Sequence, residues 1–247
     1  MAAGNGEKRI HVGTSGWTYD DWSGTFYPKA VKGSERLAYY VECFNSVEVN
    51  ATFYRVPSRA MIDAWNRRLG PEFHLAVKGH RSVTHIRELR HCRKQLESFL
   101  DRVLQLKRLK VILWQLPPTL EKDMKRLARF LAMLPDDVRH AVEFRHSSWW
   151  DEDVTSLLAD HSTAMATISH PRLPRDITPT TDFLYLRFHG QGRRVYKYDY
   201  SGDELREWAT NLEPHLRDRP LYAFFNNDAK ANAPRNAQTF RELIGTS

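Results

Sequence analysis

The sequence predicts an α/β fold built as a single TIM-like (β/α)8 barrel, and three observations support this prediction. The chain has 247 residues, of which 41% are apolar, and such a barrel takes about 250 residues. Eight short runs rich in β-branched and aromatic residues alternate with stretches of helical periodicity, which is typical of a parallel sheet. No linker rich in Pro, Gly or Ser divides the chain. We therefore expect one barrel domain at residues 10–247, preceded by a disordered tail at residues 1–9.

The predicted strands are short apolar or alternating runs bounded by turn residues. They lie at residues 10–16, 46–54, 74–79, 110–117, 139–146, 163–170, 183–190 and 221–228. A doubly wound open sheet is the alternative arrangement, but the GxGxxG turn that often opens such a sheet is absent from the sequence. The count of eight favours the barrel.

The helices are predicted from apolar residues that recur at helical spacing between these runs. One apolar face lies within residues 37–44, and longer stripes extend over residues 89–106 and 120–134. Ser201 is followed by Glu204, a capping-box pattern that predicts the start of a helix.

The crossover between the sixth and seventh predicted strands differs from the others. Residues 171–182 contain three prolines and show little hydrophobic periodicity. Proline interrupts helices because it lacks the backbone N–H group. We therefore expect an irregular loop in place of the sixth helix.

Charge and cysteine content limit the function classes. The net charge is +7, and the segment Arg55–Lys110 alone has 14 basic and 5 acidic residues by count of the sequence, which favours an anionic partner. Cys43 and Cys92 have no CxxC partner, so we expect reduced core residues in a cytoplasmic protein. No run approaches the roughly 20 apolar residues of a membrane span, so no membrane contact is predicted. The oligomeric state is not specified by the sequence.

Strand alternation predicts which side chains face a functional site. Neighbouring residues of a strand point to opposite faces, and Val47 and Val49 alternate with Glu48 and Asn50. The other strands alternate in the same way, and the polar positions lie toward their carboxyl ends, where barrel enzymes hold their sites. The predicted converging set is Glu48, Asn50, Lys78, Gln115, Glu143, Arg145, Arg187, His189 and Asn226.

Buried charges need partners, so we expect Glu143 to pair with Arg145 or Arg187, and Glu48 to pair with Lys78. A purely structural network of ion pairs is one interpretation. The functional hypothesis is an anion site in which the catalytic residues are Glu143, His189, Glu48 and Lys78. Substrate-binding residues are then Asn50, Tyr54, Gln115, Arg145, Arg187, Asn226, Trp17 and Trp149.

Aromatic residues beside cations suggest what the anion is. Trp17, Tyr54 and Trp149 follow predicted strands, where their rings can stack on bases. We expect an anionic small molecule or single-stranded nucleic acid as the partner. The alternative is that these rings close the top of the barrel and that the basic segment is a solvated helix face.

Seven ordered sequence blocks resemble the domain of unknown function 72 family, also called YecE-like proteins. They are "GTSGWTYDDWSGTFYP", "FNSVEVNATFYRVPS", "VKGHRSVTH", "LWQLPP", "AVEFRHSSWW", "YLRFHG" and "FFNNDAKANAPRNA". The resemblance extends from about residue 10 to about residue 245 and implies a single TIM-like barrel. Its fold is similar to the xylose isomerase and endonuclease IV group, which suggests sugar or nucleic-acid chemistry by analogy. The resemblance also implies an aspartate at the end of the sixth strand, where this chain has Ser169 and His170.

Three reaction classes fit the predicted residues to different degrees. Three cations beside Glu48 and Glu143 argue against a multinuclear metal centre, so neither a metal nor a cofactor is predicted. The same cations would lower both carboxyl pKa values, which disfavours a glycosidase that needs a general acid. We expect a hydrolase or lyase acting on a nucleotide or nucleic acid. The alternatives are a non-catalytic nucleic-acid or anion-binding protein and a sugar-active hydrolase or isomerase.

Overall fold

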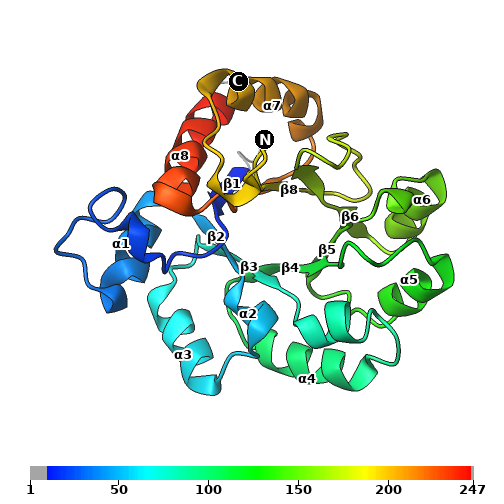
Figure 1. Cartoon of the computed structure of the whole chain (residues 1–247). Coiled ribbons are helices and arrows are strands. Elements are labelled where there is room, and N and C mark those ends of the chain that lie inside the picture. Colours follow the sequence, from blue (N-terminus) through cyan, green and yellow to red (C-terminus); the bar gives the residue numbers. More distant parts are fainter. Residues whose placement is uncertain (1–9, 246–247) are drawn as a thin grey trace, which may run out of the picture.

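The computed structural model describes residues 10–245, in which strands and helices alternate along the chain. The predicted tail at residues 1–9 lies outside the described residues. In Figure 1 the strands lie at the centre and the helices surround them. The predicted α/β class with parallel strands is confirmed.

The described strands form two parallel sheets. The first sheet has the order β1-β9-β8-β7 and the second has the order β2-β3-β4-β5-β6. Strand bounds are β1 (Ile10–Thr14), β2 (Ser46–Val49), β3 (His74–Lys78), β4 (Leu109–Gln115), β5 (Arg139–Glu143), β6 (Thr163–Met165), β7 (Thr167–Ser169), β8 (Leu184–Phe188) and β9 (Leu221–Phe225).

This arrangement corrects the strand prediction in one respect. Each of the eight predicted runs contains a strand, but the run at 163–170 divides at Ala166 into β6 and β7. The strand ladders are therefore interrupted, and no closed hydrogen-bonded barrel is found within residues 10–245. Two side-chain hydroxyl groups account for the interruptions.

The first interruption lies between β1 and β2. The Tyr40 hydroxyl accepts a hydrogen bond from the Thr14 backbone N–H at 2.9 Å and donates one to the Ser46 carbonyl at 3.1 Å. The Tyr40 hydroxyl therefore takes the place of a direct backbone hydrogen bond between β1 and β2. The two backbones are close at this point, because a side chain on Gly13 would overlap the Ser46 carbonyl. One isolated parallel bridge, between Ser15 and Glu48, follows directly.

The second interruption lies where β6 gives way to β7. The Met165 N–H donates to the Thr180 hydroxyl at 2.9 Å, and that hydroxyl donates to the Thr163 carbonyl at 2.7 Å. Thr180 therefore takes hydrogen bonds that a neighbouring strand would otherwise make. Beyond Ala166 the chain pairs with β8 instead of β5.

Eight α-helices are described, and the longer ones lie outside the strands (Figure 1). The Ser201–Glu204 capping box is confirmed, since the Glu204 N–H donates to the Ser201 hydroxyl at 3.2 Å and the Ser201 N–H donates to Glu204. Helix bounds are α1 (Arg36–Cys43), α2 (Ala51–Tyr54), α3 (Arg59–Arg68), α4 (Arg93–Val103), α5 (Met124–Leu131), α6 (Glu152–Asp160), α7 (Gly202–Leu216) and α8 (Asn232–Gly245).

The loop prediction is also confirmed, because no helix lies between β7 and β8 in the described chain. A π-helical turn, Ser82–Ile86, follows β3. Both cysteines are free thiols; Cys92 is buried and Cys43 is half-buried. Across residues 10–245 no helix is both long enough and apolar enough to span a bilayer.

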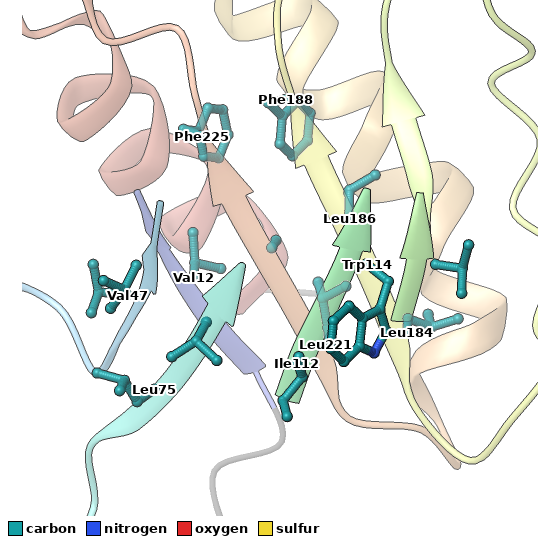
Figure 2. Packing of buried hydrophobic residues seen from close by; sticks show 14 of the residues in the cluster. Val12, Val47, Leu75, Ile112, Trp114, Leu184, Leu186, Phe188, Leu221 and Phe225 are labelled. Carbon is teal, nitrogen blue, oxygen red and sulfur yellow. The ribbon is translucent and has the colours of Figure 1, made fainter. Parts of the chain in front are cut away.

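The hydrophobic core has two parts, and their members follow the predicted strand alternation. Figure 2 shows the part that includes Val47, Leu75 and Ile112, which also contains the buried faces of the helices. A smaller apolar cluster contains alternate residues of the same strands, among them Ala76 and Val111. The two faces of the strands are thus separated as predicted. The polar residues at the carboxyl ends of the strands lie on the same face as the smaller apolar cluster.

Candidate functional site at the carboxyl ends of the strands

Five ionisable side chains meet at the carboxyl ends of β2, β5 and β8, and we call them the charged cluster. Four have no exposed surface, and the fifth, Arg145, has a side chain that is 10% exposed. Charges are rarely removed from water unless they pair with opposite charges. The charged cluster consists of Glu48, Glu143, Arg145, Arg187 and His189.

Arg187 is the centre of the charged cluster. Its Nη2 atom lies 2.7 Å from Glu48 Oε1, and its Nη1 atom lies 2.6 Å from Glu143 Oε2. Burial lowers the pKa of Arg187, but Glu143 and Glu48 outweigh that effect and raise it above its usual range. Arg187 is therefore a permanent cation between two carboxylates. The predicted pair of Glu48 with Lys78 is wrong, because Arg187 takes its place.

Glu48 has two further partners that the sequence did not indicate. The Ser15 hydroxyl donates to Oε1 at 2.6 Å and the Tyr185 hydroxyl donates to Oε2 at 2.6 Å. Burial and Glu48 hold the pKa of Tyr185 well above its usual range, so it remains a donor. Strand alternation places Tyr185 on the same face as Arg187, but Tyr185 was not included in the predicted converging set. These bonds fix Glu48 in place.

Glu143 pairs with both predicted arginines. Arg145 Nε donates to Oε1, and Arg187 Nη1 donates to Oε2. Burial alone would raise the pKa of Glu143, but Arg145 and Arg187 hold it well below its usual range. Glu143 is therefore ionised and paired, so it is a poor proton donor near neutral pH.

His189 is neutral and hydrogen-bonded at both ring nitrogens. Its Nε2 atom lies 2.8 Å from Arg145 Nη2, and burial together with Arg145 holds its pKa well below the usual range. A guanidinium only donates, so Nε2 accepts and the ring proton lies on Nδ1. Nδ1 lies 3.2 Å from the Asn226 amide, whose other end lies 3.4 Å from Asn50.

The proton on Nδ1 fixes the orientation of both amides. An amide oxygen and nitrogen exchange places by a half turn, and the orientation is assigned from the hydrogen bonds. With the Asn226 oxygen toward His189, its nitrogen points toward Asn50, so the Asn50 amide must also be turned to present Oδ1 in place of the Nδ2 that faces Asn226 at 3.4 Å. Asn50, Asn226 and His189 then form one chain of hydrogen bonds, as their predicted convergence requires.

Lys78 lies at the edge of the charged cluster with a half-buried side chain. Its Nζ atom lies 4.2 Å from the centroid of the Phe53 ring, and no carboxylate among residues 10–245 lies within 4.0 Å of it. Burial, followed by Arg187, lowers the pKa of Lys78 to about 8. His85 also contacts Phe53, with ring centroids 4.8 Å apart. His85 was not among the site residues predicted from the sequence.

The remaining predicted substrate-binding residues lie in different environments. Gln115 is half-buried at the end of β4, beside Glu143 in the strand register. Trp17 is half-buried against Trp65, with ring centroids 5.9 Å apart. Tyr54 is 68% exposed and is therefore free to contact a ligand.

Trp149 departs from its predicted role. It has no exposed surface, its ring stacks on Phe144 at 4.6 Å, and its Nε1 donates to the Leu120 carbonyl at 2.7 Å. Trp149 is a core residue in this conformation and presents no face to a ligand.

Two further observations limit what the site can bind. One concerns the side chains that could ligate a metal ion, and the other concerns the location of the basic segment Arg55–Lys110. Among the described residues no group of three or more His, Cys, Asp or Glu is placed to hold a metal ion. Part of the segment Arg55–Lys110 lines a separate cleft beside α4 and α5, and Arg90, Arg93 and Arg129 are among the residues that line it. From this segment, Lys78 is the cation that lies beside Arg187 and Glu143.

Sequence comparisons confirm the resemblance inferred from the sequence blocks. The family model "Protein of unknown function DUF72" matches residues 11–247. The UPF0759 protein YunF of Bacillus subtilis (strain 168) is 24% identical over an alignment of 269 positions, which includes 95% of this chain and 94% of YunF. The UPF0759 protein YecE of Escherichia coli (strain K12) is 29% identical over 143 residues, which cover 57% of this chain and 50% of YecE.

Solved structures agree with this result. A crystal structure of a DUF72 family protein from Thermotoga maritima has a TM-score of 0.86 at 32% identity, with 96% of this chain and 99% of that chain covered. A DUF72 family protein from Enterococcus faecalis has a TM-score of 0.82 at 17% identity, with 96% of each chain covered, and it shares the fold. The chain therefore belongs to the DUF72 family.

Proposed function

We propose that this protein is an enzyme, a hydrolase or a lyase, that acts on a phosphate-bearing nucleotide or nucleic acid at the carboxyl ends of its strands. One observation carries the proposal. Glu48 and Glu143 are engaged by buried Arg187, while Lys78 and Arg145 lie at the less buried edge. An anion that reaches this edge meets two cations, and the nearest carboxylates already have partners.

Anion binding would also change the state of His189. A phosphate oxygen is a stronger acceptor for a guanidinium than an imidazole nitrogen is. When phosphate binds Arg145, the Nε2 atom of His189 loses its nearer donor, at 2.8 Å, and keeps only the longer contact with Arg187 Nη1 at 3.4 Å, so it accepts a proton more readily. We assign proton transfer to His189 and phosphate binding to Lys78 and Arg145, with Asn50 and Asn226 orienting the imidazole.

We further propose that the two sheets together constitute one (β/α)8 barrel. The Ser15–Glu48 bridge joins β1 to β2, and a single residue, Ala166, separates β6 from β7. In such a barrel the charged cluster would lie at the carboxyl ends of the strands, where enzymes of this architecture hold their sites.

The proposed function is tested by fluorescence anisotropy of short labelled single strands, DNA and RNA separately, and by calorimetry with a mononucleotide. The variants are Lys78→Met and Arg145→Gln. The matched control is Arg93→Gln, whose side chain is 71% exposed and pairs only weakly with Glu97 at 3.6 Å. We expect each site variant to weaken binding about tenfold or more, as the loss of a charge-assisted hydrogen bond does, and the control to bind as the wild type does.

The proposal fails if the wild type binds none of these ligands, or if the site variants bind as tightly as the control. Binding without turnover of any bound nucleotide or strand would support a non-catalytic anion-binding protein instead. A steep dependence of affinity on salt would indicate that several phosphates of a polymer are contacted.

A further inference from the structure

We propose that the Lys78 amine forms an imine with an open-chain aldehyde or ketone that carries a phosphate, so that the site performs lyase chemistry through a covalent intermediate. This inference rests on the proposed function for the phosphate contact, which it leaves to Arg145 at the edge of the charged cluster. It changes the role of Lys78 from a phosphate-binding cation to the reacting amine, and it names the electrophile.

Lys78 is held in place by its backbone. It is the last residue of β3, and the Thr52 hydroxyl donates to its carbonyl at 2.7 Å. The N–H of the next residue, Gly79, donates to the Leu113 carbonyl at 2.8 Å. A side chain that starts from a fixed strand end has a limited range of positions, which favours a productive approach to a bound carbonyl.

The charged groups of the described chain around Lys78 leave its amine without an ion-pair partner, whereas the Phe53 ring, 4.2 Å from Nζ, favours the ammonium form. The positive groups that act on it are Arg187 from β8 and Arg145 after β5, and the negative groups are Glu48 and Glu143. Both carboxylates are bound to Arg187, so neither forms an ion pair with Nζ. Desolvation beside other cations is a recognised way to activate a lysine nucleophile.

The pKa agrees with this geometry. Burial, followed by Arg187, lowers the pKa of Lys78 to about 8. At pH 7 the Lys78 amine is therefore neutral in about one-tenth of the molecules, whereas an ordinary lysine is neutral in fewer than about one in a thousand. His85, which contacts the same Phe53 ring, is a neutral imidazole because burial and Lys78 lower its pKa to about 4.

The reaction balances without an oxidant or a reductant. The nitrogen lone pair attacks the carbonyl carbon, a C–N bond forms, and the carbonyl oxygen is protonated. That oxygen then leaves as water together with the two hydrogens that the neutral amine carried, and a C=N bond remains. The imine withdraws electrons from the adjacent carbon, so a proton there becomes acidic and a phosphate one carbon further can leave by β-elimination.

The test is trapping of the imine by borohydride, read out by intact mass and peptide mapping. The probes are glyceraldehyde 3-phosphate, unphosphorylated glyceraldehyde, and a single-stranded oligonucleotide with one abasic site. A trapped adduct increases the protein mass by the mass of the carbonyl compound less one oxygen atom. We expect a single adduct on the peptide that contains Lys78, formed at least tenfold faster with glyceraldehyde 3-phosphate than with glyceraldehyde.

Lys78→Arg is the matched variant, since it retains the charge and every other lysine. We expect it to lose the adduct, whereas the Arg93→Gln control, whose exposed side chain lies outside the charged cluster, should be trapped at the wild-type rate. The inference is overturned if Lys78→Arg is labelled as fast as the wild type, if the wild-type adducts are spread over other lysines, or if the phosphate makes no difference. Trapping of the sugar phosphate or of the abasic strand identifies which one supplies the carbonyl. If the wild type binds the nucleotide but gives no borohydride-trapped adduct with any of the three probes, the imine proposal is overturned and the proposed function is left intact.

Discussion

The Nη2 atom of Arg145 lies 2.8 Å from the Nε2 atom of His189. Because the guanidinium has no acceptor, this contact determines the protonation of the imidazole: Nε2 accepts and Nδ1 carries the proton. We predict that 15N NMR detects a neutral His189 in the Nδ1–H form that does not titrate between pH 5 and 8, a range of about three units around the usual histidine pKa.

Arg145→Gln should shift the His189 resonances of the free protein, whereas Arg93→Gln should leave them unchanged. Addition of inorganic phosphate should reproduce the effect of Arg145→Gln, because the anion competes for the same guanidinium. A charged His189 ring at pH 7 would contradict the assignment. So would His189 resonances that shift neither in Arg145→Gln nor on addition of phosphate.

Removal of Arg187 should destabilise the fold strongly. Arg187→Met leaves Glu48 and Glu143 buried without their shared cation, and breaking a buried ion pair costs about 3–5 kcal/mol. Urea unfolding would measure this loss. The double variant Glu48→Gln/Arg187→Met should recover part of it, since it buries one charge fewer. An Arg187→Met protein as stable as an Arg93→Met control would contradict the expectation.

Two histidines at the amino-terminal ends of β1 and β3 should make stability depend on pH. His11 and His74 stack with ring centroids 3.7 Å apart. Burial and His74 lower the pKa of His11 to about 3, and burial and Lys110 lower that of His74 to about 4. The neutral forms are favoured in the folded state, so this stabilisation is complete above the unfolded pKa of about 6.5 and is lost as pH falls toward the folded values.

Each of these histidines contributes a slope of about 1.4 kcal/mol per pH unit to the free energy of unfolding between those limits. Denaturant unfolding at several values between pH 7 and pH 4.5 measures the slope. His74→Gln retains a hydrogen-bonding group near the Tyr222 hydroxyl, 3.1 Å from His74 Nδ1, and cannot titrate. The slope measured for His74→Gln should be lower than the wild-type slope by the contribution of about one proton, which is about 1.4 kcal/mol per pH unit. Equal slopes for the two proteins would count against the prediction.

The hydroxyl of Tyr40 should control the contact between β1 and β2. Tyr40→Phe leaves the Thr14 N–H and the Ser46 carbonyl without their partner, and unsatisfied buried polar groups cost about 1–3 kcal/mol each. We expect a lower free energy of unfolding and faster hydrogen exchange at the Thr14 amide. Tyr54→Phe is the control, because Tyr54 is 68% exposed. Unchanged exchange at Thr14 would show that the hydroxyl does not hold the two strands.

Strand alternation was enough to predict the two faces of each strand. Val47 lies in the core and Glu48 in the charged cluster, because successive side chains point to opposite sides. Alternation does not determine which charges pair. Arg187 reaches two carboxylates because a planar guanidinium donates in two directions, whereas the Lys78 ammonium is a single point charge.

The interruptions between the sheets could not be predicted from strand patterns. They depend on single hydroxyl groups, Tyr40 in a helix and Thr180 in a proline-rich loop, that bond to backbone atoms of strands. Trp149 was misplaced for a related reason. Periodicity sets side-chain direction within a strand but not in the loop that follows it, and there the indole turned to stack on Phe144.

The ion pairs of Arg187 connect the two sheets. Arg187 belongs to β8 of the four-stranded sheet, whereas Glu48 and Glu143 belong to the five-stranded sheet. A collapsed chain that docks the sheets in another register buries a guanidinium and two carboxylates apart, and each unmatched ion costs several kcal/mol. The charged cluster therefore favours one arrangement of the two sheets, because only that arrangement gives all three buried ions their partners.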